Sequence, residues 1–220
     1  MSTSQRILFG AAVVFLASGV VHAGVWLSAG MPSLDGPVSW RKPMTFGFST
    51  GVLFLSLTWV LGLLPHNRRL VRQVWLFTTL LVAEVALIDM QQWRGVPSHF
   101  NNATAFDAVV FQMMGLLIIS ASILIALWTR SLFVHQLPTT PAFAFAARAG
   151  MLLLNFGNLV GLAIAVTEAT ALKPLHGAAL HAIQALPVAV WVLTRVGYPR
   201  AWHGTSRSSR WVSSLRQQHR

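Results

Sequence analysis

Residues 105–128, AFDAVVFQMMGLLIISASILIALW, decide the fold class, because only one residue in this long apolar run, Asp107, carries a charge. A helix needs about 20 such residues to cross the hydrocarbon core of a bilayer. The whole chain is 55% hydrophobic and 10% charged, whereas a soluble domain carries about 25% charged residues. The sequence therefore predicts an all-α, polytopic membrane helix bundle with six transmembrane helices. The other five apolar runs are 7–30, 44–64, 70–90, 148–168 and 176–195.

The basic residues predict the orientation of this bundle. With the N-terminus inside, the inner segments hold twelve of the 16 Lys and Arg residues and the outer segments hold four. Such a bias is typical of the cytoplasmic side. We therefore expect both termini to be cytoplasmic and residues 1–196 to form a six-helix transmembrane domain. We expect residues 197–220 to form a basic, disordered cytoplasmic tail that is attracted to anionic lipids.

Other features of the composition narrow the class of protein. The triplet VHA at 21–23 resembles a signal-peptidase site, but the apolar run continues to Ala29, so we expect a retained first span. The chain has no cysteine, which excludes disulfides and thiolate metal ligands. The net charge of +11 follows the topology and does not indicate a nucleic-acid partner. Arginine far exceeds lysine, which suggests a bacterial protein of the cytoplasmic membrane.

Polar side chains gather on the predicted outer side. All five acidic residues and four of the eight histidines fall there, although topology does not require it. At ~1.5 Å rise per residue, His22, Glu84 and His181 lie ~12, ~9 and ~7 Å below the outer ends of their helices. Ionisable residues at such depth are costly unless they face the bundle interior, so they are candidates for a functional site. The acidic residues are Asp35, Glu84, Asp89, Asp107 and Glu168, and the histidines are His22, His99, His176 and His181.

These residues suggest a cofactor site. Histidines on separate membrane helices can serve as axial ligands of haem b, and a carboxylate can complete a transition-metal site. We expect His22, His181 and Glu84 to form the metal-binding set, with His176 as a further cofactor ligand. The spacing matches no zinc signature.

The stretch MQQWRGVPSHFNNATAFD, at 90–107, is expected to fold over this site as a lid. Thr104 and Asp107 have the spacing of a helix cap. We expect Arg94 to pair with Asp89 or Glu168, because an Arg at a membrane interface needs partners for its donors, and His99 to point towards His176. Trp40 suits the headgroup layer. The predicted lid and polar cluster comprise Trp93, Arg94, His99, Asp89, Asp107, Glu168 and Gln184.

Three functions are consistent with this pattern. The first is a haem- or metal-binding protein of redox type. The second is a proton- or ion-coupled transporter of a small solute, although the inner half offers few ionisable groups for a continuous path. The third is a non-catalytic subunit that binds lipid, a membrane partner or a second copy of itself. No serine and histidine pair indicates a hydrolase, and the sequence leaves open whether the protein is an enzyme.

Glycine pairs predict how the helices pack. Gly47 and Gly51 form one GxxxG spacing, and Gly157 and Gly161 form another. Small residues at this spacing let two membrane helices approach closely. We interpret both pairs as packing contacts.

Overall fold

The computed structural model describes residues 1–196 and contains six long α-helices without any strand in that range. Each helix is long and apolar enough to cross a membrane, which confirms the prediction of an all-helical fold with six helices of spanning length and is compatible with a multi-pass membrane protein. The predicted tail, 197–220, lies outside the described residues. The elements are α1 (Thr3–Ser28), α2 (Arg41–Gly62), α3 (Arg68–Trp93), α4 (Ala105–Val134), α5 (Pro141–Thr167), a short 3-10 helix η1 (Thr170–Leu172) and α6 (Lys173–Arg195).

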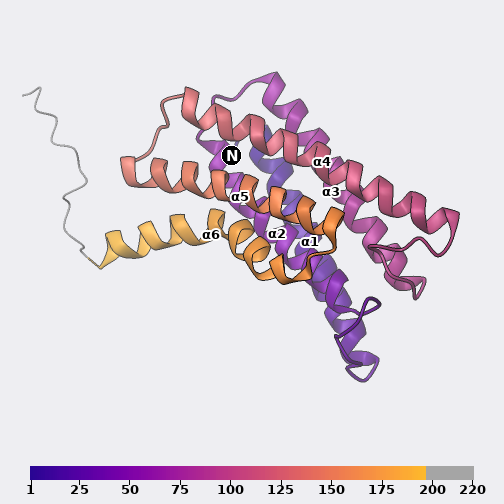
Figure 1. Ribbon diagram of the computed structural model, residues 1–220. Helices are drawn as coiled ribbons and strands as arrows, with labels where there is room; N and C mark the ends of the chain where they lie inside the picture. Colours follow the sequence, from indigo (N-terminus) through magenta and orange to yellow (C-terminus); the bar gives the residue numbers. More distant parts are fainter. Residues whose placement is uncertain (197–220) are drawn as a thin grey trace, which may run out of the picture.

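Successive helices run up and down through the bundle, so the connections alternate between its two ends (Figure 1). One end, here called the acidic end, carries the segments 29–40, 94–104 and 168–172. The opposite end, here called the basic end, carries the N-terminus and the segments 63–67 and 135–140. All five acidic residues of the chain lie on the acidic-end side or in the helix halves that lead to it.

Helices α1 and α2 pack with their backbones in direct contact. A Cβ atom added at Gly47 would lie 2.6 Å from the amide nitrogen and 2.7 Å from the Cα of Gly19. One at Gly51 would lie 2.7 Å from Cγ of Leu16. Only glycine fits at these positions, so the predicted packing role of Gly47 and Gly51 is confirmed.

Helices α5 and α6 form a second close pair. A Cβ atom at Gly150 would lie 2.8 Å from the Cα of Ile183, and one at Gly157 would lie 2.9 Å from Cδ2 of Leu180. The packing prediction for Gly157 is therefore also confirmed. Few side chains of α6 are buried; those that are comprise Ala179, Ala182 and Ile183.

A chain of aromatic rings joins the first four helices through the core. The ring centroids of Phe15 and Phe54 are 5.1 Å apart, and those of Phe54 and Phe77 are 5.3 Å apart. Trp128 follows at 5.1 Å from Phe77. Rings at these separations pack favourably, so this row fixes the relative positions of α1, α2, α3 and α4.

Several helix boundaries differ from the apolar runs in the sequence. Helix α2 begins at Arg41, before Pro43, because a proline in the first turn gives up a donor that has no helical acceptor. Helix α4 continues to Val134 and α5 begins at Pro141, so the connection between them is short. The Thr140 side chain caps the start of α5 by accepting from the Phe143 amide.

Candidate functional site

The buried histidine of α1 is the centre of a polar cluster at the acidic end. His22 is 6% exposed, as the sequence predicted for an inward-facing residue. Its Nδ1 lies 2.9 Å from the Ser18 carbonyl oxygen, and its Nε2 lies 3.2 Å from the indole nitrogen of Trp93. The Asp89 carboxylate on α3 lies 4.0 Å from the same Nε2. The cluster therefore links α1 to the last turns of α3.

These contacts assign the hydrogens on the His22 ring. A carbonyl oxygen can only accept, so Nδ1 carries a hydrogen and donates to Ser18. The indole N–H of Trp93 can only donate, so Nε2 is its acceptor. The ring is thus neutral in this arrangement. If Nε2 gained a proton it would lose Trp93 as a donor and turn to Asp89, so two alternative partners lie beside one nitrogen.

Trp40 is a member of this cluster that sequence reasoning placed in the headgroup layer instead. Its ring centroid lies 6.0 Å from that of His22 and 5.0 Å from that of Trp93, which it meets edge to face. Trp40 is the residue that precedes α2, and the tight packing of α1 on α2 brings it to His22. The sequence held one indication of this position, because the Gly47 and Gly51 pair predicts that another helix approaches α2 closely.

Helix α3 carries three buried polar atoms without hydrogen-bond partners among the described residues. They are Oγ1 of Thr78, Oε2 of Glu84 and Oδ1 of Asp89. Glu84 is 4% exposed, which confirms the inward direction predicted for it. Thr78 was not predicted, because a threonine in an apolar helix gives no signal in a single sequence. In a membrane interior such atoms are expensive and mark sites where a ligand, water or proton is bound.

The loop 94–104 is held to the bundle by Asp107 in the first turn of α4. Its carboxylate accepts from Arg94 at 2.7 Å, from Gln91 at 3.0 Å and from the Thr104 hydroxyl at 2.6 Å. Thr104 in turn accepts from the Asp107 amide, which confirms the predicted cap. The prediction that Arg94 pairs with Asp89 or Glu168 was wrong, because Asp107 lies directly across the turn between α3 and α4.

His99 is a residue of this loop, and its ring lies among aromatic side chains. Its ring centroid is 6.0 Å from that of Phe46 and 6.1 Å from that of Phe111. Its Nδ1 lies 2.9 Å from the Ser98 hydroxyl, which also accepts from Lys42 at 3.4 Å. Ser98 and Lys42 were not predicted as members of the site.

The surroundings of His99 disfavour its charged form. Burial of the ring, together with the positive charges of Lys42 and Lys173, lowers the pKa of His99 from its ordinary value of 6.5 to about 4. The ring and hydrogen-bond neighbours of His99 lie on α2, the loop and α4, and its orientation towards His176 stays a prediction.

This pKa predicts a pH-dependent stability. Between pH 6.5 and about 4 the unfolded chain binds a proton at His99 that the folded chain does not. The free energy of unfolding should therefore fall as the pH drops through this window, by on the order of 3 kcal/mol at its lower end. Thermal unfolding in detergent at a series of pH values measures this. His99→Phe should remove that part of the pH dependence, whereas the exposed control His66→Phe should retain it. Identical profiles for His99→Phe and the wild type would contradict the prediction.

The predicted residues of α5 and α6 do not join the His22 cluster. His176 donates from Nδ1 to the Gly157 carbonyl at 2.7 Å, and it fills the space left by Gly161. His181 is exposed, so the prediction that it faces inward was wrong. Its position, 140° from His176 around the helix, places it away from α5. Glu168 is exposed and ends α5 with its backbone in the left-handed conformation. The Oε1 atom of Gln184 is buried and has no hydrogen-bond partner among the described residues.

The side chains are not arranged as ligands of haem or of a metal. Both ring nitrogens of His22 already have hydrogen-bond partners, and His181 lies on an exposed surface. Within residues 1–196 no three His, Asp or Glu side chains form a group that could hold a metal ion. What the structure does offer is a close pair of ionisable side chains, His22 and Asp89, and a further buried carboxyl group, Glu84, on the same helix as Asp89.

Comparisons of the chain with protein-family models, curated proteins and solved structures gave no match. The function is therefore argued from this geometry.

Proposed function

We propose that the protein couples proton movement through the bundle to the transport of a small solute, with α3 as the helix that carries the proton. The observation that supports this most strongly is that α3 carries three buried polar atoms without hydrogen-bond partners within residues 1–196, on Thr78, Glu84 and Asp89. Glu84 lies ~7.5 Å along the helix axis and about 140° around the helix from Asp89, and Thr78 lies ~9 Å further along the axis. These steps exceed a hydrogen bond, so water would have to bridge them.

Groups near both ends of α3 also support this role. At the acidic end, His22 has Trp93 and Asp89 as alternative partners of one ring nitrogen, so it can take up a proton and pass it to the carboxylate. Towards the basic end, α3 continues to Gln73, which lines a cavity at that end. The few ionisable groups in the inner halves of α1 and α6 weaken a path along those helices, but they do not bear on a path along α3.

A transmembrane carboxylic acid is a proton carrier that few other side chains can replace. Glu84→Gln keeps the shape of the side chain but cannot exchange a proton. We expect infrared difference spectra recorded between two pH values to show the carboxylic C=O band of Glu84 in the wild type and not in Glu84→Gln. We also expect proton uptake by proteoliposomes under an imposed membrane potential to fall to background in this variant.

Glu168→Gln is the matched control, because it makes the same chemical change at an exposed position. It should retain both the infrared band and the proton uptake. Wild-type uptake in Glu84→Gln would contradict the proposed path. A Glu84 band in protein that moves no protons, with or without added solutes, would contradict transport and favour a site that only binds protons.

A further inference from the structure

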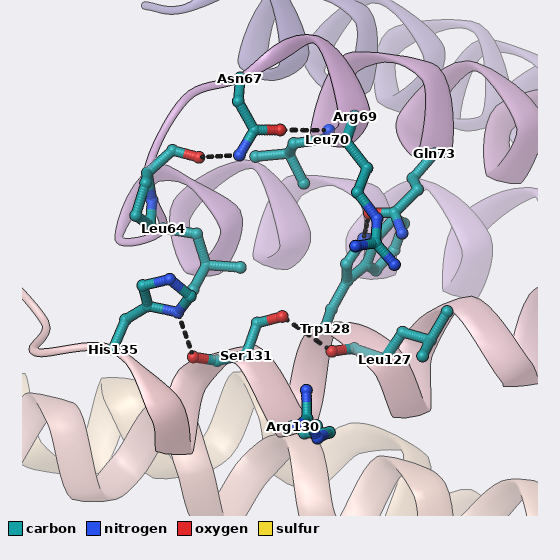
Figure 2. Close-up of a pocket in the computed structure, with 11 residues that line it drawn as sticks. Leu64, Asn67, Arg69, Leu70, Gln73, Leu127, Trp128, Arg130, Ser131 and His135 are labelled. Atoms are coloured by element: carbon teal, nitrogen blue, oxygen red, sulfur yellow. Dashed lines mark hydrogen bonds between the residues drawn. The ribbon is translucent and has the colours of Figure 1, made fainter.

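A second feature of the structure is a cavity at the basic end, between the turn that joins α2 to α3 and the last turns of α4 (Figure 2). Its volume is about 280 Å³. It lies at the opposite end of the bundle from His22 and Asp89, and the proton path proposed above is not needed to explain it. Its lining is partly cationic and partly apolar, with Arg69, Arg130 and His135 as the basic members.

The polar groups of this cavity are donors. Arg69 projects from α3 and Arg130 from α4 (Figure 2). Gln73 accepts from the indole nitrogen of Trp128 at 3.1 Å, which leaves its amide N–H groups available. His135 donates from Nδ1 to the Ser131 carbonyl, at 2.9 Å, and its neutral ring has no second N–H to add to these donors. A set of guanidinium and amide donors on two helices suits the several acceptor oxygens of a phosphate group.

No side-chain carboxylate balances these charges. All five Asp and Glu residues of the chain lie in the half of the bundle towards the acidic end. Both ion pairs found among residues 1–196 are also there. Arg69 and Arg130 therefore have no Asp or Glu side chain of their own chain within reach, which leaves both guanidinium groups able to bind an added anion.

The apolar part of the lining indicates what kind of molecule would carry the phosphate group. Leu64, Leu70 and Trp128 form a buried apolar wall. Leu127 also lines the cavity and is 40% exposed, and Ile123, one turn away on α4, is 57% exposed. The apolar wall thus continues onto the outer surface of a membrane helix, where an acyl chain would lie. A soluble phosphate would gain nothing from that surface.

We propose that this cavity binds an anionic phospholipid, with the phosphate held between Arg69 and Arg130 and an acyl chain along Leu127 and Ile123. Basic pockets between membrane helices on the cytoplasmic side are suited to anionic headgroups. The arginine distribution assigns the basic end to that side. Independently of what the protein transports, the bound lipid would hold the α2–α3 turn against the end of α4.

The test is a titration of the purified full chain, in neutral detergent, with phosphatidylglycerol and separately with phosphatidylcholine, followed by native mass spectrometry. The wild type should retain phosphatidylglycerol and prefer it to phosphatidylcholine. Arg69→Gln should weaken this binding by about tenfold, since one charge-assisted contact is lost. Arg69→Gln/Arg130→Gln should abolish the preference. Arg6→Gln/Arg195→Gln removes two exposed charges from the same end of the bundle and should leave the preference intact.

Three results would overturn the proposal. One is an unchanged preference in Arg69→Gln and in the double variant. Another is an equal loss in Arg6→Gln/Arg195→Gln, which would indicate attraction to the overall charge. The third is displacement of the lipid by inorganic phosphate, which would assign the cavity to a soluble phosphate. The single variant changes one exposed side chain, so circular dichroism and size exclusion should match the wild type even if the double variant fails to fold.

Discussion

Gly47→Leu is expected to prevent α1 and α2 from packing against each other. A Cβ atom at this position would lie 2.6 Å from a backbone nitrogen of Gly19, and backbone atoms cannot move aside as the end of a side chain can. Overpacking of a core costs about 1–3 kcal/mol when side chains can adjust, and we expect a larger loss here because whole helices must separate. Thermal unfolding in detergent, followed by circular dichroism, measures it.

Gly115→Leu on α4 is the control for this substitution. A Cβ atom there has no neighbour within 4 Å, so the same chemical change should leave the unfolding midpoint close to that of the wild type. The packing argument would be contradicted by a Gly47→Leu protein as stable as Gly115→Leu. Because Trp40 reaches His22 through the α1–α2 contact, Gly47→Leu should also disrupt the His22 cluster.

The second large effect is expected at Asp107. Asp107→Ala removes the common acceptor of Gln91, Arg94 and the Thr104 hydroxyl, and the three donors are left without it. Loss of a partner that leaves buried donors unpaired is the costly way to break a hydrogen bond. We expect the loop 94–104 to detach from the helix ends while α4 stays in place.

A cysteine reporter measures this opening, because the chain has no cysteine of its own. Ser98 is 3% exposed, so Ser98→Cys should react slowly with a soluble maleimide. Adding Asp107→Ala should speed the labelling by about tenfold or more, because tenfold is the change expected for loss of a single charge-assisted contact and three are lost here. Asp35→Ala removes an exposed carboxylate from another loop at the same end and should have no effect. Equal labelling rates in the two backgrounds would show that Asp107 does not hold the loop.

The features that could be predicted from the sequence are those that depend on local pattern. Long apolar runs identify membrane helices because a spanning helix must satisfy its own backbone. The Thr104–Asp107 cap and the glycine pairs are likewise local, because spacing along one helix decides them. The inward direction of His22 and Glu84 followed from the cost of placing them in lipid.

The features that could not be predicted depend on which helices become neighbours. His181 was expected to face inward for the same reason as His22, namely its depth below the helix end. However, α6 buries few residues, and the His181 side chain is exposed. The partner of Arg94 is set by the turn between α3 and α4, where Gly95 and Phe100 both adopt positive φ. The polar atom of Thr78 could not be identified from the sequence, because only the packing of α3 against its neighbours leaves it buried without a partner among the described residues.

The separation of acidic and basic residues has an electrical consequence. With most arginines at one end and the carboxylates towards the other, the bundle carries a dipole along its long axis, and in a membrane a potential that is negative on the basic side would favour this orientation. Glu84 lies roughly a third of the way through ~30 Å of hydrocarbon from the acidic end. A proton that reaches it would cross a similar share of the voltage, worth about 0.7 kcal/mol per 100 mV. Occupancy of Glu84 would therefore rise with membrane potential at constant pH.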